Sequence, residues 1–247
     1  MGSEEGQVRH WIRLVAGIAI GFGIVALASA VATEIPAVRS FVEARAWLTR
    51  GDVIQFVFFW ASLALMAVLS RGRVSAYGLR GTGPSEIRRV IAVAGSVAVV
   101  IGLLSAVGSV VAGAGSGGGP SSAVRGLLKL IVSVWIVASV SEELLFRGLI
   151  QSFLEPLREH GFGFFGRRVS LPVTVAAIGF GLVHLGLLTM APPPMVAAVV
   201  VSATVLGFIA GYYREKTGSI VPAIVAHFVF NVLGSGIPML AMLIAYR

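Results

Sequence analysis

Residues 141–147 read S-E-E-L-L-F-R, and they lie within a long, mainly apolar stretch, residues 126–154. The carboxylates of Glu142 and Glu143 and the guanidinium of Arg147 therefore fall inside a segment long enough to span a membrane. An ionisable side chain at the centre of such a helix costs at least about 2.5–3.5 kcal/mol. We therefore expect these three side chains to have polar partners on other segments of the chain.

The composition is that of a polytopic membrane protein. Of the 247 residues, 57% are hydrophobic and only 12% are charged, whereas a soluble domain carries about 25% charged residues. The chain has no cysteine, which excludes disulfides, thiol catalysis and Cys-ligated metal sites. Its net charge is +8, but the basic residues lie in short segments between apolar ones, as in cytoplasmic loops. We therefore expect the lipid bilayer as a partner and no nucleic acid.

The apolar segments predict an all-α, polytopic bundle of about seven or eight transmembrane helices. They are residues 14–32, 53–70, 90–112, 126–156, 171–188, 195–213 and 220–246. The last is long for one crossing, and Gly and Pro in residues 234–238 are expected to break or kink it. Between the spans we expect an interfacial amphipathic segment at residues 33–52, a flexible loop at 113–122 and a short basic loop at 158–170.

The distribution of basic residues predicts a cytoplasmic N-terminus. With that orientation, twelve of the nineteen Lys and Arg residues fall in inside segments and five fall in outside segments. We divide the chain into three parts. Residues 1–125 form the N-terminal transmembrane helices and loops, residues 126–234 form the core with the polar motifs, and residues 235–247 form a C-terminal helical tail.

Polar side chains in three different spans are predicted to lie at similar depth. Glu142 lies 16 residues before the loop residue Arg158, and His184 lies 16 residues after Arg168, so each is ~24 Å from the same side. Asn231 follows Lys216 by 15 residues, or ~22 Å, and His227 lies one turn nearer. This shared depth predicts one polar site built from three helices.

Helical spacing then separates the two glutamates. Glu143 and Arg147 are four residues apart and are expected to form an ion pair. Glu142 points about 100° away from Glu143 and has no local cation, so it is free to accept a proton as a general base. His227 and Asn231 share a face. They could bind a metal ion or stabilise a developing oxyanion.

Spacing alone leaves three functions open. The site could be a polar network that fixes helix packing, a path for protons or ions, or a hydrolytic centre.

Three short motifs resemble those of a known family. They are E-E-x-x-x-R (Glu142, Glu143, Arg147), F-x-x-x-H (Phe180, His184) and H-x-x-x-N (His227, Asn231). Their order on three separate apolar segments is similar to the CPBP family of intramembrane endopeptidases. This family includes CAAX prenyl proteases and bacteriocin-processing proteins and is also called the Abi family. The resemblance covers residues 126–233.

The resemblance implies an endopeptidase that acts on membrane-associated peptides or proteins. Glu142 would activate the attacking water, with Glu143, His184, His227 and Asn231 completing the catalytic set and with Arg147 and Phe180 as structural support. Zinc is the possible cofactor, with Glu142, His184 and His227 as candidate ligands, although a mechanism without metal is favoured. The Ala-, Gly- and Val-rich composition resembles that of bacterial members, which predicts a location in the bacterial plasma membrane. The alternative is a non-catalytic scaffold or bacteriocin self-immunity protein that binds a peptide in the same cavity.

Overall fold

The computed structural model describes residues 2–111, 126–164 and 166–245. It shows an all-α bundle, as the apolar segments predicted, with one small β-hairpin. The first helices are α1 (Gly2–Thr33), α2 (Pro36–Glu43), α3 (Arg50–Leu69) and α4 (Pro84–Val111). The later ones are α6 (Ser139–Glu143), α7 (Leu171–Val183), α8 (Pro193–Thr217) and α9 (Val221–Ala245). The loop predicted at residues 113–122 lies outside the described residues.

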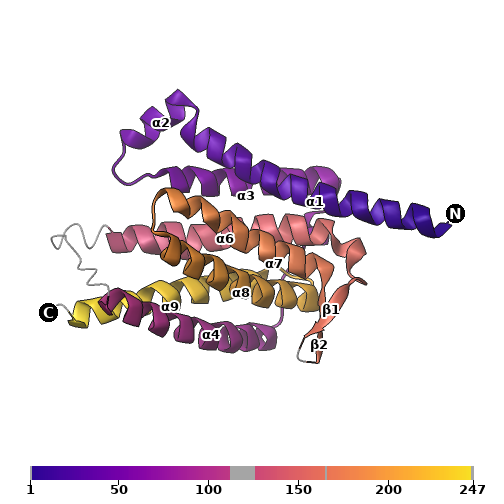
Figure 1. Cartoon of the computed structure of the whole chain (residues 1–247). Coiled ribbons are helices and arrows are strands. Elements are labelled where there is room, and N and C mark those ends of the chain that lie inside the picture. Colours follow the sequence, from indigo (N-terminus) through magenta and orange to yellow (C-terminus); the bar gives the residue numbers. More distant parts are fainter. Residues whose placement is uncertain (1, 112–125, 165, 246–247) are drawn as a thin grey trace.

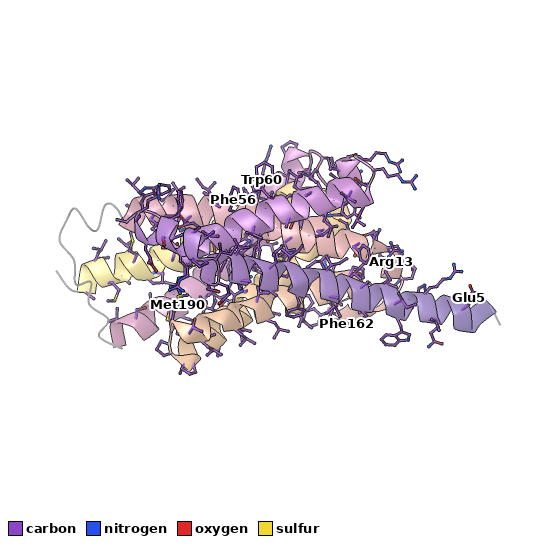
Figure 2. The ribbon with its side chains drawn as sticks, turned by 90° about the horizontal axis from the view of Figure 1, so that it is seen from above. Glu5, Arg13, Phe56, Trp60, Phe162 and Met190 are labelled. Carbon is purple, nitrogen blue, oxygen red and sulfur yellow. The ribbon has the colours of Figure 1, made fainter. Side chains whose placement is uncertain are left out.

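Six helices in the described part of the chain are long and apolar enough to cross a membrane. They are Glu5–Thr33, Arg50–Leu69, Pro84–Val110, Leu171–Thr189, Pro193–Thr217 and Val221–Ala245. Many apolar side chains point outward, and Figure 2 shows Phe56 and Trp60 on the outer face of α3, where 63% and 53% of their surface is exposed. Such a surface suits contact with lipid rather than water. The chain is a multi-pass membrane protein.

The helix that carries Glu142 runs through the middle of the bundle. Its backbone is helical without interruption over residues 126–153, and we call this segment the central helix. It contains α6 between two π-helical segments, Leu130–Ala138 and Leu144–Gln151. In Figure 1 it lies between α1 and α3 on one side and α4 and α9 on the other. The middle of the chain therefore supplies the most buried helix, where residues 141–151 are all buried.

The segments predicted to face the cytoplasm meet at one end of the bundle. The rings of His10 and His160 lie 5.1 Å apart, and Arg13 Nε donates to the carbonyl oxygen of Phe153 at 2.9 Å. Arg80 Nε donates to the carbonyl oxygen of Gly218 at 2.8 Å. Figure 1 shows the N-terminus and the hairpin at this end. The spans therefore alternate in direction as the distribution of basic residues predicted. That this end faces the cytoplasm stays a prediction.

Two local predictions are corrected by the structure. Residues 158–170, expected to be a loop, contain an antiparallel hairpin of β1 (Gly161–Phe164) and β2 (Arg167–Ser170). Gly166 adopts a φ of 69° in its turn, a conformation that glycine takes without a steric penalty. The break expected at residues 234–238 is absent, because α9 continues through Pro238 to Ala245. Neighbouring helices and small local adjustments make proline tolerable in helices of this kind.

Glycines permit close packing of α7 against α8. A Cβ atom added at Gly207 would lie 2.8 Å from Ala177 Cα, which is backbone and cannot rotate away. Glycines at such contacts let helix backbones approach closely in membranes. Glycines also let α1 lie close to the central helix, where Gly17 and Gly21 face Leu154 and Ile150.

We expect Gly207→Ala to destabilise the protein by about 1–3 kcal/mol, because the added methyl group overpacks the contact between α7 and α8. The measurement is the midpoint of thermal unfolding in detergent. Gly234→Ala is the matched control, since a Cβ atom there meets nothing within 4 Å. Equal midpoints for the two variants would contradict the packing argument.

Candidate functional site

An ion pair on the central helix forms the base of the site. Arg147 Nη1 lies 2.8 Å from Glu143 Oε1, and both side chains are completely buried. This is the pair predicted from the four-residue spacing. The planar guanidinium also lies against the Phe180 ring, with Cζ 4.6 Å from the ring centroid. The charge of Arg147 is therefore stabilised by a carboxylate and by an aromatic face.

His227 on α9 reaches between the two glutamates. Its Nδ1 lies 2.9 Å from Glu143 Oε1, and its Nε2 lies 3.8 Å from Glu142 Oε2. An ionised carboxylate can only accept a hydrogen bond, so the proton of a neutral His227 ring belongs on Nδ1. Nε2 then faces Glu142 without a proton. The structure thus joins His227 to both carboxylates, as the shared depth predicted.

Glu142 is held by an amide that sequence reasoning missed. Gln55 Nε2 on α3 donates to Glu142 Oε1 at 2.6 Å, and Ser141 Oγ donates to Gln55 Oε1. Glu142 retains 9% of its surface exposed, whereas Glu143 retains none. The signal that could have revealed Gln55 is its position as the single amide side chain in the apolar stretch 53–70.

Phe180 is the aromatic centre of the site. Its ring centroid lies 5.2 Å from those of Phe146 and His184 and 5.3 Å from that of His227. All three contacts are edge-to-face, a favourable geometry for aromatic pairs. Phe180 therefore contacts Arg147 of the ion pair and both histidines.

His184 lies at the edge of this arrangement. It ends α7, and its Nδ1 lies 2.8 Å from the carbonyl oxygen of Phe180. Because a carbonyl oxygen only accepts, Nδ1 carries the proton of the neutral ring. Among the described residues, Nε2 of His184 has no hydrogen-bond partner, and the ring contacts His227 only through Phe180.

The side-chain amide of Asn231 is hydrogen-bonded to the central helix. Its Nδ2 donates to the carbonyl oxygen of Val134 at 2.9 Å and to Ser139 Oγ at 3.1 Å. These contacts join α9 to the central helix before Glu142 in the chain. Within the described residues, Asn231 makes no hydrogen bond to Glu142 or His227, so its amide is engaged in positioning the central helix.

The candidate zinc ligands are not gathered into a metal-binding group. Within residues 2–111, 126–164 and 166–245, no three His, Asp or Glu side chains are arranged to hold a metal ion. His227 Nε2 lies 3.8 Å from Glu142 Oε2, whereas the ring contact of His184 is with Phe180. The donor set present in this structure therefore does not fit a three-ligand zinc site.

A buried cluster of two glutamates, an arginine and a histidine inside a polytopic helical bundle defines an intramembrane polar centre. Residues 124–233 match the family model described as type II CAAX prenyl endopeptidase Rce1-like. The match covers 110 of the 247 residues and supports the resemblance to the CAAX-type membrane proteases of the CPBP family. No curated protein and no solved structure matches the chain. The six motif residues and Phe180 fall inside the matched segment, whereas Gln55 lies outside it.

Proposed function

We propose that this protein is an intramembrane endopeptidase in which Glu142 activates the water that attacks a peptide bond. The observation that carries the proposal is the charge balance of the site. Two buried carboxylates share one guanidinium, and Arg147 bonds to Glu143. The cluster therefore has a surplus negative charge, and accepting one proton would neutralise it.

The reaction that we propose has two proton movements. Glu142 takes a proton from water, and the resulting hydroxide bonds to the carbonyl carbon of the substrate. The carboxylic acid of Glu142 then returns that proton to the leaving nitrogen as the carbon–nitrogen bond breaks, which yields a carboxylic acid and an amine. His227 Nε2 lies 3.8 Å from Glu142 Oε2, so its lone pair faces the proton that Glu142 holds between the two steps.

The other residues have supporting roles in this proposal. Glu143 fixes the His227 ring through Nδ1, and Arg147 balances the charge of Glu143. His184 offers a second imidazole near Phe180. We assign Asn231 to positioning rather than to the oxyanion, because its amide nitrogen already donates to Val134 and Ser139. No step is assigned to a metal ion.

An apolar groove beside the site supports a membrane-associated substrate. Its volume is about 200 Å³, and α1, the central helix and α7 line it through residues that include Gly21, Phe146, Ile150, Ile178 and Leu182. Phe146 at the groove packs on Phe180 in the site. A groove of this chemistry accepts an apolar chain or side chain. We therefore propose a peptide or protein substrate that is embedded in, or anchored to, the bilayer.

The proposal is tested with purified protein in detergent and a library of apolar peptides, with and without a chelator. We expect new peptide termini, detected by mass spectrometry, in both samples. Cleavage that is lost with chelator and restored by zinc would instead indicate that the histidines bind a metal ion. Peptides that bind but remain intact would favour the non-catalytic scaffold or immunity protein.

Gln55→Leu should lower kcat by about tenfold to a hundredfold, because a hydrogen bond to a charged group contributes ~1.5–3 kcal/mol. Without Gln55 Nε2, Glu142 loses the donor that fixes one of its oxygens. Initial rates at saturating peptide measure the effect. Ser62→Ala, at a buried position on the same helix, is the control and should keep the wild-type rate. A wild-type rate for Gln55→Leu would show that Gln55 does not contribute to catalysis.

A further inference from the structure

A polar pocket of about 380 Å³ lies at the end of the bundle where α8 ends and α9 begins. Its lining includes four basic side chains, Arg80, Arg158, Arg214 and Lys216, and two acidic ones, Glu155 and Glu215. Glu142 is not among the lining residues, and Ser152, which is, follows Glu142 by ten residues on the central helix. The pocket is therefore separate from the proposed catalytic site.

Two of the four cations are paired with carboxylates. Arg158 lies 3.6 Å from Glu155 and 3.4 Å from Glu215. Lys216 lies 2.9 Å from Glu86, which stands outside the pocket lining. These contacts use one oxygen of Glu155 and one of Glu215, while Glu155 Oε2 has no hydrogen-bond partner among the described residues.

Arg80 and Arg214 bond to neutral oxygens. Arg80 Nε donates to the carbonyl oxygen of Gly218 at 2.8 Å, and Arg214 Nη2 donates to Ser152 Oγ at 2.7 Å. Within the described part of the chain, neither guanidinium has a carboxylate within 4.0 Å, and Arg214 Nε has no hydrogen-bond partner. Arg214 is only 6% exposed. Glu155 and Glu215 therefore act on Arg214 only from beyond 4.0 Å. A buried charge without a counter-ion in direct contact is costly, and an anion that touches Arg214 would offset that cost.

Glycines hold both arginines in place. Gly78 and Gly218 have φ values of 85° and 68°. A Cβ atom at Gly78 would lie 2.8 Å from Arg214 Nε, and one at Gly218 would collide with Arg80 Nη2. The two guanidinium groups thus lie directly on backbone that has no side chain. These backbone contacts position both guanidinium groups at the pocket.

We propose that this pocket binds a phosphate group, and that the phosphate belongs to the headgroup of an anionic phospholipid. Guanidinium groups match phosphate oxygens in geometry as well as in charge. The pocket lies at the end of the bundle that we predict to be cytoplasmic, where basic pockets between helices recognise anionic headgroups. This inference does not depend on the peptidase proposal.

The bound headgroup would stabilise the central helix. Arg214 donates to Ser152 Oγ, and Ser152 Oγ in turn donates to the carbonyl oxygen of Arg147 at 3.2 Å. A phosphate that fixes Arg214 therefore acts on the helix that carries the site. Binding should raise the unfolding temperature of the wild-type protein, since a ligand that binds only the folded state stabilises it.

The test is thermal unfolding of the purified full chain in detergent, titrated with phosphatidylglycerol, phosphatidylcholine or inorganic phosphate. We expect phosphatidylglycerol to raise the unfolding temperature more than phosphatidylcholine, whose choline group would oppose the arginines. We expect Arg214→Gln to weaken phosphatidylglycerol binding about fivefold to tenfold. Arg80→Gln should have the same effect, and its exposed position makes a folding defect less of a concern. Arg88→Gln, at an exposed position at the same end of the bundle and outside the pocket lining, is the matched control.

Each outcome has a defined meaning. A shift with phosphatidylglycerol that requires Arg80 and Arg214 but not Arg88 supports the headgroup site. The same dependence with inorganic phosphate shows that phosphate alone is recognised and that the lipid chains are not required. Equal shifts with both lipids, an undiminished shift in both pocket variants, or an equal loss in Arg88→Gln would overturn the proposal.

Discussion

Arg147→Met should destabilise the folded protein by about 3–5 kcal/mol, because breaking a buried ion pair leaves its partner charge uncompensated. The stranded charge is that of Glu143, whose carboxylate is fully buried and whose remaining described partner is His227. Methionine is apolar and of similar length, so the packing against Phe180 is largely retained while the charge is removed. Denaturant or thermal unfolding in detergent measures the loss.

Two further variants separate charge from packing. Arg88→Met removes an exposed arginine and should leave stability nearly unchanged. The double variant Glu143→Gln with Arg147→Met removes both charges and should be more stable than Arg147→Met alone, because neighbouring substitutions are not additive. If Arg147→Met unfolds at the wild-type midpoint, the pair does not stabilise the fold as we describe.

Glu142→Gln should lower kcat by about 10²–10⁴-fold, the range that a general base contributes. The amide has nearly the shape of the carboxylate but cannot take a proton from water. Its oxygen can still accept the hydrogen bond from Gln55 Nε2 that Glu142 Oε1 accepts now. We therefore expect the variant to fold and to bind peptide like the wild type, so that binding and unfolding assays accompany the rate measurement.

The matched control is Glu159→Gln, a glutamate whose side chain is 86% exposed near the end of the bundle, and it should keep the wild-type rate. Glu142→Asp is informative as well, since the shortened side chain keeps the base but withdraws it from Gln55. It should give an intermediate rate. Loss of folding together with activity in Glu142→Gln would point to a structural role for Glu142.

The features that could be predicted from sequence depend on regular spacing. The Glu143–Arg147 pair follows from four-residue periodicity on one helix, and the spans follow from long apolar runs. The meeting of His227 with the glutamates follows from equal depth on separate helices. In each case a count of residues along the chain, converted by helix geometry, predicts where a side chain lies.

The features that were missed depend on how neighbouring helices are rotated and joined. Gln55 lies 87 residues from Glu142 on a helix outside the family match, and one amide produces no periodic signal. The face of Asn231 was predictable, but the carbonyl of Val134 that it meets depends on the rotation of the central helix. Of the break or kink predicted at residues 234–238, the break does not occur, because unpaired backbone groups are so costly in lipid that helices persist through proline.

The account depends most on Glu142 as the proton acceptor in peptide hydrolysis. The direct measurement is single-turnover cleavage of one defined peptide by the wild type and by Glu142→Gln, with both proteins saturated and the products identified by mass spectrometry. We predict complete cleavage by the wild type and intact, bound peptide with Glu142→Gln. Cleavage at the same bond and the same rate by both proteins would contradict the account.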